Sequence, residues 1–412
     1  MTSQQAESAI LRLPSAELPT WPHYDDEQIA AVTDVLRSGK VNAWTGDHVR
    51  QFEEEFASFV GTRHAVAVAN GTVALELALE ALDIPQGTEV IVPCRTFLAT
   101  ASAVVARGCR PIFADVERSS GNVSVRTLAP LITERTSAII CVHLAGWPCE
   151  MDEIMSLAHQ HGLKVIEDCA QAHGAEYHDQ PVGSLGHAAA FSFCQDKIIS
   201  TGGEGGILTT DDETVWKRAW SYKDHGKGYD TVFNTEHEGV FRWLHDSLGT
   251  NWRLTEMQAA IGRVQLERLP EWVETRQSHA ATLTTLLSDH PTVRVAVPPS
   301  HVKHACYKFY AYLRPEFLRG EWTRDRVVRE LQDSGIPAGC GSCAEIYLEQ
   351  GIQQAGLAPS APCEVSQELG ETSLMFPVHP TLTTEHVIRM GQAVRGVLDG
   401  MLAETSNLKR AA

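Results

Sequence analysis

Residues 64–82 read HAVAVANGTVALELALEAL and pass from one hydrophobic pattern to another. His64–Ala69 is a short apolar run containing β-branched residues, which is typical of a buried strand. Asn70-Gly71-Thr72 predicts a tight turn, because asparagine and glycine tolerate the backbone angles that turns need. Val73–Leu82 then returns to strong helix formers. The segment therefore predicts a strand, a turn and a helix in direct succession.

The same alternation extends on both sides of this segment. Helices are expected before it at Asp25–Arg37 and Asp47–Val60, and after it at 96–107 and 151–161. Further short apolar strands are expected at Glu89–Val92, Arg110–Phe113, Ala138–His143, Lys164–Glu167, Ala190–Phe193 and Gly206–Thr209. Because strands separated by helices form parallel sheets covered on both faces, the chain is predicted to be an α/β protein with a mostly parallel central sheet.

The C-terminal third of the chain has a different organisation. Residues 255–289 predict long helical material with a break at Pro270, followed by a strand at Ala305–Leu313. Helices are expected at Thr323–Ser334 and Thr384–Met401. We therefore predict three parts, which are a flexible leader over 1–20, a large domain over 21–265 and a smaller α+β domain over 266–412.

Composition excludes several classes of partner. The 412 residues include 52 acidic and 34 basic side chains, which gives a net charge of −18 and no basic stripe. Such a chain repels nucleic-acid phosphates and anionic lipids, so neither nucleic acid nor a membrane is expected as a partner. Residues 1–20 lack a secretory pattern and no run of eighteen apolar residues occurs, which predicts a soluble cytoplasmic protein.

The ten cysteines suggest reduced core thiols and no disulfide framework. Cys340 and Cys343 form the single CxxC, and the nearby sequence does not supply the two further ligands that zinc would need. No metal site is expected.

The ends of three predicted strands carry unusual residues, and ligands bind at such ends in open parallel sheets. Gly71-Thr72 opens a helix, which suits a phosphate but also an ordinary capped turn. Asp168 could hold the protonated nitrogen of a heterocycle, or it could cap a helix or pair with an arginine. Lys197 precedes a glycine-dense loop that lets backbone approach a ligand, although a surface lysine before a flexible turn has the same pattern.

A lysine nucleophile, a carboxylate for a ring nitrogen and a phosphate-binding helix start together match the needs of pyridoxal 5′-phosphate. The GxxxxGK[ST] and GxGxxG patterns of nucleotide-binding loops are absent from the corresponding positions. The chain resembles the DegT/DnrJ/EryC1/StrS sugar aminotransferases, of fold type I, from about Pro22 to the closing helix. The segments that carry the resemblance are FEEEFASFVGTRHAVAVANGTVALELAL, EVIVPCRTFLATASAVV, DCAQAHGA, FSFCQDKIISTGGEGG, NWRLTEMQAAIGRVQLERL and FPVHPTLT.

The resemblance implies a role for each matching position. Lys197 is implied to bind the cofactor aldehyde covalently and to move the proton, and Asp168 is implied to pair with the pyridine nitrogen. The remaining implied cofactor contacts are Gln171 near the ring hydroxyl, Phe97 stacked on the ring, and Gly71, Thr72 and Ser192 at the phosphate. Asn251 matches an asparagine that reaches the neighbouring subunit's phosphate, which implies a homodimer with shared active sites. Phe97 could otherwise be a simple core aromatic.

The implied activity is transfer of an amino group from L-glutamate to a keto group of a nucleotide-linked hexose in amino-sugar biosynthesis. A keto-cyclitol or a keto-sugar phosphate is an alternative acceptor, and a non-catalytic regulatory or binding protein of the same fold is an alternative of another class. The family's dehydratases typically replace the lysine with histidine, so Lys197 argues against that branch. The stretch GIPAGCGSCAEIYLEQ at 335–350 lacks the usual His-Tyr pattern and leaves the sugar open.

Several further residues are candidates for contacts with an anionic substrate. Trp44 and the DHGKG run at 224–228 could lie near the substrate, although they could equally be a packing aromatic and a solvated loop. Lys223, Lys227 and Arg253 are candidates for the local positive charge that a sugar nucleotide would need.

Overall fold

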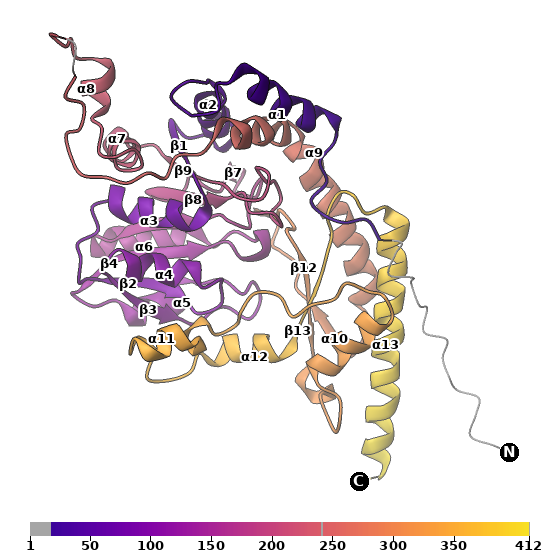
Figure 1. The fold of residues 1–412 in the computed structure, drawn as a ribbon. Coiled ribbons are helices and arrows are strands. Elements are labelled where there is room, and N and C mark those ends of the chain that lie inside the picture. Colours follow the sequence, from indigo (N-terminus) through magenta and orange to yellow (C-terminus); the bar gives the residue numbers. More distant parts are fainter. Residues whose placement is uncertain (1–17, 240–241, 412) are drawn as a thin grey trace.

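The structure, a computed structural model, describes residues 18–239 and 242–411 (Figure 1). Within these residues, seven strands form a central sheet in the order β1-β9-β8-β5-β4-β2-β3. All run parallel except β9, which is antiparallel to both of its neighbours. The predicted α/β class with a mostly parallel sheet is confirmed. The strands are β1 (His64–Val68), β2 (Glu89–Pro93), β3 (Arg110–Ala114), β4 (Thr136–Val142), β5 (Lys164–Asp168), β8 (Ala188–Ser192) and β9 (Gly206–Thr210).

Helices cover both faces of this sheet because its strands are apolar on both sides. In β1, Val66 and Val68 face one core, whereas Ala65 and Ala67 face the other. The first core contains α3 (Gly71–Ala81), α4 (Ala99–Ala106) and α7 (Glu213–Tyr222). The opposite face is covered by α2 (His48–Val60), α6 (Met151–His161) and the first part of α9 (Glu256–Leu287). The alternation of buried residues therefore places the sheet between two helical layers.

The predicted helix break at Pro270 is wrong, because α9 continues through this residue over its 32 residues. Proline removes one backbone donor from a helix and usually bends or ends it. Here Leu266, Leu269 and Val273 lie on both sides of Pro270 and are buried in one core. We infer that this packing compensates for the lost hydrogen bond and keeps the two halves in one helix.

A second, antiparallel sheet in the described chain has the order β10-β12-β13, with β10 at Val293–Val295 and β13 at Ser373–Phe376. The strand predicted at Ala305–Leu313 is shorter than expected, since β12 covers Phe309–Leu313. Cys306 has φ 50°, a left-handed conformation that interrupts an extended strand. This sheet shares a separate core with α10 (Arg324–Asp333), α13 (Thr384–Ala411) and the end of α9.

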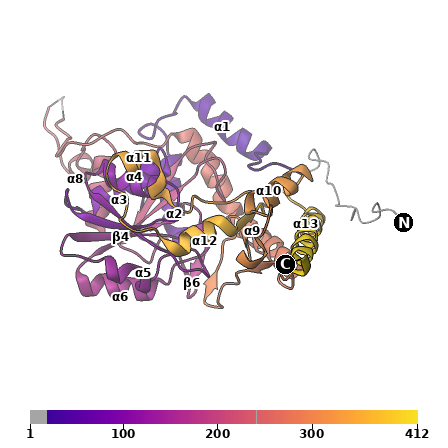
Figure 2. The same ribbon diagram turned by 90° about the horizontal axis from the view of Figure 1, so that it is seen from below.

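The segment between β12 and β13 also returns to the central sheet. Ile346, Tyr347, Ile352 and Cys363 are buried in the same core as α3 and α4. Figure 2 shows α12 (Glu364–Thr372) extending between the sheet and the helices α10 and α13.

Leu18 packs against the C-terminal core, and residues 1–17 of the predicted flexible leader lie outside the described residues. The domain boundaries proposed from the sequence stay a prediction.

The helices not yet named are α1 (Asp26–Ser38), α5 (Val125–Leu128), α8 (Tyr229–Phe233) and α11 (Gln350–Gln354). The short strands β6 (Glu176–Tyr177), β7 (Gln180–Pro181) and β11 (Val302–Lys303) form a third sheet, and α8 projects away from the central sheet beside α7 (Figure 1). The helix predicted at 96–107 starts later, since α4 begins at Ala99. Among the described helices, none is both long enough and apolar enough to cross a bilayer.

Candidate active site

The predicted site residues gather at the C-terminal edge of the central sheet. Asp168 ends β5 and Ser192 ends β8, which is the adjacent parallel strand. Gly71 begins α3 directly beside Ser192, because a Cβ atom on Gly71 would lie 2.5 Å from the Ser192 Cβ. A side chain at position 71 would therefore clash, so glycine is required for this close approach. The sheet brings together residues that are about one hundred and twenty positions apart in the chain.

Asp168 is a buried acid without a cationic partner. Its side chain accepts hydrogen bonds from the Thr100 hydroxyl at 2.9 Å and from the Ala170 amide at 3.2 Å. Burial raises the pKa of Asp168, and these two hydrogen bonds oppose that shift only in part. No arginine or lysine of the described chain forms an ion pair with it, so the alternative of an arginine-paired acid does not hold there. The carboxylate suits an external cation such as a protonated ring nitrogen.

The start of α3 offers free backbone donors. The Asn70 side chain accepts from the Val73 amide, and the first helical hydrogen bond joins the Ala74 amide to the Asn70 carbonyl. The amides of Gly71 and Thr72 precede this bond, as the first amides of any helix do, and are available to an anion. The Ser192 side chain is buried beside them. This arrangement suits a phosphate group.

Phe97 follows β2 and is 70% exposed, although Arg95 and Thr96 immediately before it are fully buried. The alternative that Phe97 is a core aromatic is therefore wrong. An exposed ring beside a buried strand end offers an apolar face on which a planar ligand can stack.

Lys197 is partly buried, with 17% of its side chain exposed, and is not the surface lysine of the alternative interpretation. Its Nζ lies 3.2 Å from Asp196 Oδ1 and 5.2 Å from the centre of the Tyr307 ring. The Trp21 indole donates a hydrogen bond of 2.7 Å to the Lys197 carbonyl, which fixes the backbone at this position. The glycine-dense loop follows, with Gly202 and Gly203 at φ 84° and 119°, values that side chains disfavour.

Gln171 connects the site to the C-terminal part of the chain. Its Oε1 accepts from the Ala145 amide at 2.8 Å, and the Ala145 carbonyl accepts from the Tyr307 amide at 2.9 Å. Tyr307 in turn lies against Lys197. Sequence reasoning missed Thr100, Tyr307 and Lys308, because no local pattern distinguishes them from other polar or aromatic residues. Asp196 could have been noticed only by its position next to Lys197.

Asn251 lies on a segment beside β1, since the Trp252 carbonyl accepts a hydrogen bond from the Ala69 amide. Its side chain is exposed, and its backbone bridges to Asp224. The structure brings Trp44 and the 224–228 run together at this point. Asp224 accepts hydrogen bonds from the Trp44 indole at 2.6 Å, from Arg253 at 2.6 Å and from Lys227 at 3.1 Å.

These contacts show that two of the three predicted substrate-binding cations, Lys227 and Arg253, already have a partner within the chain. Asp224 is 1% exposed, and both Lys227 and Arg253 form ion pairs with it. Burial alone would raise the pKa of Asp224, but the hydrogen bond from Lys227 and the neighbouring positive charges outweigh it and lower the pKa. Lys227 and Arg253 thus share one carboxylate, which compensates one of their two positive charges and fixes both side chains in place.

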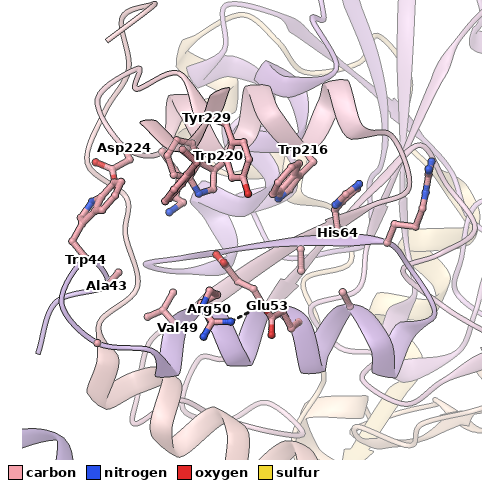
Figure 3. Close-up of a pocket in the computed structure, with 17 residues that line it drawn as sticks. Ala43, Trp44, Val49, Arg50, Glu53, His64, Trp216, Trp220, Asp224 and Tyr229 are labelled. Atoms are coloured by element: carbon pink, nitrogen blue, oxygen red, sulfur yellow. Dashed lines mark hydrogen bonds and ion pairs between the residues drawn. The ribbon is translucent and has the colours of Figure 1, made fainter. Parts of the chain in front are cut away.

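Lys223 lines a cavity of about 420 Å³ between α2 and α7, together with Trp44 and Asp224 (Figure 3). Trp216, Trp220 and Tyr229 line one side of it, and Glu53 points into it from α2 (Figure 3). His64 and Ala65 also line it, so the cavity reaches the N-terminal end of β1. None of the predicted cofactor-binding residues lines this cavity, so it is separate from the candidate active site.

A second cavity, of about 630 Å³, adjoins the candidate active site. It lies between α9, β12 and the turn after β4, and its lining includes Ala145, Lys308 and Tyr310. Lys308 Nζ lies 5.0 Å from the centre of the Tyr307 ring, the same ring that lies against Lys197. Burial lowers the pKa of Lys308, and no carboxylate of the described chain pairs with its ammonium group. Lys308 is therefore available to an anionic ligand.

Comparisons with known proteins agree with this geometry. The model of the DegT/DnrJ/EryC1/StrS aminotransferase family matches residues 22–395. The chain belongs to this family. Among curated relatives of this aminotransferase, GDP-perosamine synthase of Escherichia coli O157:H7 is 40% identical and covers 85% of this chain and 90% of its own. UDP-N-acetyl-3-dehydro-α-D-glucosamine 3-aminotransferase of Acidithiobacillus ferrooxidans is 37% identical and covers 86% of this chain and 90% of its own.

A solved aminotransferase from Psychrobacter cryohalolentis superposes on this aminotransferase with a TM-score of 0.91 and 48% identity, covering 93% of this chain and 99% of that one. The likeness confirms fold type I. The protein is a pyridoxal 5′-phosphate-dependent aminotransferase. The residues present fit this cofactor, since the buried acid lacks a cation, the aromatic ring has a free face, and the helix start has free amides.

Proposed function

We propose that this aminotransferase transfers the amino group of L-glutamate to a keto group of a nucleotide-linked hexose, in the biosynthesis of an amino sugar. The observation that carries the proposal is the placement of Lys197, an unpaired buried Asp168 and the free amides of α3 at one edge of the sheet. Two relatives named for nucleotide-linked sugars support the choice of acceptor.

Each residue has a distinct task in this reaction. When bound, the cofactor supplies an electron-withdrawing ring that accepts the charge left when the substrate carbon loses a proton. Asp168 holds a proton on the ring nitrogen, which maintains that electron demand. Lys197 binds the aldehyde carbon and, once released, carries the proton between the substrate and the cofactor. Phe97, Gln171, Gly71, Thr72 and Ser192 hold the ring and the phosphate.

Both substrates are anions, and the chain as a whole has a net charge of −18. Attraction must therefore come from cations close to the reacting atoms. Lys308 meets this need better than Lys227 or Arg253, which already pair with Asp224. We assign Lys308 to a carboxylate or phosphate group of a substrate.

The assembly we propose is a cytoplasmic homodimer with shared active sites. In it, Asn251 reaches the cofactor phosphate of the partner subunit. Its exposed position on the segment beside β1 supports this role, because the side chain is available to another molecule.

The test is a spectrum of the purified protein with its cofactor, recorded before and after addition of L-glutamate. We expect glutamate to remove the visible absorbance band as the cofactor becomes aminated, and a nucleotide-linked keto-hexose to restore it. Restoration by a keto-cyclitol alone would overturn the choice of acceptor. No change with glutamate would favour the non-catalytic alternative.

A further inference from the structure

Asp196 lies between Lys197 and Tyr307 and contacts both. One carboxylate oxygen, Oδ1, is 3.2 Å from Lys197 Nζ. The other oxygen, Oδ2, accepts a short hydrogen bond from the Tyr307 hydroxyl. About half of the Asp196 side chain is exposed to solvent. The residue thus divides its two oxygens between the reactive amine and a tyrosine from a distant part of the chain.

Tyr307 is held firmly enough to fix this geometry. It is 6% exposed, and its amide donates to the Ala145 carbonyl at 2.9 Å. Its carbonyl accepts a hydrogen bond of 3.1 Å from the buried Arg276 guanidinium. Because the backbone is bound on both sides, the hydroxyl has a defined position relative to Asp196.

The surroundings of Asp196 and Tyr307 determine the charge state of each. Burial opposes ionisation of Asp196, but the Lys197 charge and the Tyr307 hydrogen bond outweigh it, so the pKa of Asp196 is lowered. Burial and the nearby Asp196 charge raise the pKa of Tyr307, which keeps the hydroxyl protonated and able to donate. Asp196 is therefore an ionised carboxylate that accepts a hydrogen bond from the neutral Tyr307 hydroxyl.

We propose that Asp196 and Tyr307 form a pair that positions the free amine of Lys197. Asp196 orients the amine whenever it is not bonded to the cofactor. Tyr307 donates a hydrogen bond to one oxygen of the Asp196 carboxylate. This hydrogen bond weakens the attraction of the carboxylate for the ammonium form of Lys197, so the lysine can give up its proton more easily. The inference rests on the proposed role of Lys197 as the reactive amine, and both partners are positioning residues.

The experiment measures how fast Lys197 is modified in the cofactor-free protein. Trinitrobenzenesulfonate reacts only with a neutral amine, and peptide mass mapping locates the product. Asp196→Asn keeps the shape and the Tyr307 contact but removes the charge, so we expect labelling to become about two- to five-fold faster, as for a half-exposed ion pair. Tyr307→Phe keeps the ring and frees the second oxygen for Lys197, so we expect slower labelling by a similar factor.

Opposite effects of the two variants are the signature of the pair, since a structural disturbance would speed labelling in both. Glu204→Gln removes an exposed carboxylate from the same loop and is the matched control, with no change expected. Equal effects of Asp196→Asn and Tyr307→Phe, or effects no larger than the control, would overturn the proposal.

If Asp196→Asn does not fold, Asp196→Glu takes its place, and preserved slow labelling in this variant supports the pair whereas fast labelling contradicts it. The labelling does not require turnover. An absent response to glutamate would therefore contradict the proposed function without affecting this result.

Discussion

At the scale of single residues, Asp168 has the surroundings that its proposed role as partner of a cationic ring requires. The acid is buried, and within the described chain its donors are a hydroxyl and an amide rather than a cation. Such an environment raises the pKa and makes the isolated carboxylate unfavourable. In the proposed site a bound cationic ring would relieve this penalty, so cofactor binding and the ionisation of Asp168 would favour each other.

This coupling leads to a prediction for Asp168→Asn. The amide can keep the Thr100 contact but cannot hold a proton on the ring nitrogen, so we expect kcat to fall by at least about 100-fold. Turnover with L-glutamate and the cofactor spectrum measure the effect. Asp152→Asn changes an exposed acid on α6 and serves as the control, with activity retained. Near-normal turnover of Asp168→Asn would contradict the assigned role.

At the scale of elements, Asp224 joins three segments that are far apart in the sequence. Trp44 precedes α2, Lys227 follows α7 and Arg253 precedes α9, and each donates to this one carboxylate. Lys227 also lies 4.0 Å above the Trp44 ring. The ends of three helices are thus fixed relative to one another by a single buried charge.

Stability should depend on the ionisation of Asp224. Folding lowers the pKa of Asp224. The stability gained from its ionised form is therefore fully present above the unfolded pKa of 3.8, and it is lost as the pH falls through the lower pKa of the folded protein. At pH 7 we expect Asp224→Asn to lower the free energy of unfolding by about 3 kcal/mol, because two cations lose their counter-charge. Urea unfolding between pH 7 and pH 3 measures both the loss of stability and its pH dependence. The difference in the free energy of unfolding between Asp224→Asn and wild type should become smaller at acidic pH.

Asp34→Asn is the control for this series. Asp34 pairs with Arg37 on the surface, with both side chains more than three-quarters exposed, so its loss should change stability very little. An Asp224→Asn variant as stable as wild type at pH 7 would show that the three contacts do not hold the segments together.

At the scale of the whole molecule, the described part of the segment between α7 and α9 carries three strongly exposed apolar side chains. Phe233, Trp243 and Leu248 are 57%, 83% and 93% exposed, and all lie between α7 and α9. Strongly exposed apolar side chains on one segment favour a surface that contacts another protein. Their position next to the segment that carries Asn251 agrees with the proposed homodimer.

The proposed shared active sites predict complementation between two impaired variants. Lys197→Ala removes the reactive amine of a site, and Asn251→Ala weakens phosphate binding in the partner's site. When equal amounts are unfolded and refolded together, half of the dimers are mixed and each has one intact site, so about one quarter of wild-type activity should return. Refolding each variant alone is the control. No activity in the mixture would contradict a site built from two subunits.

The order of the elements could be predicted from the sequence, and so could the strand ends that carry the candidate site residues. The change from strand pattern to helix pattern at residues 64–82, and its repetition, determines a mostly parallel sheet, because both patterns are local consequences of side-chain chemistry. Ligands of such sheets bind at strand ends, so Asp168 and Lys197 could be found from their positions alone. Their roles came from the resemblance to the family.

The partners of these residues were decided only by the tertiary structure. Nothing local predicts that Tyr307 contacts Asp196, that Asp224 pairs with both Lys227 and Arg253, or that α9 continues through Pro270. Each of these features depends on packing between segments that are distant in the sequence. Local propensity sets which elements form, whereas the charge, exposure and hydrogen bonds of a side chain depend on what the fold places beside it.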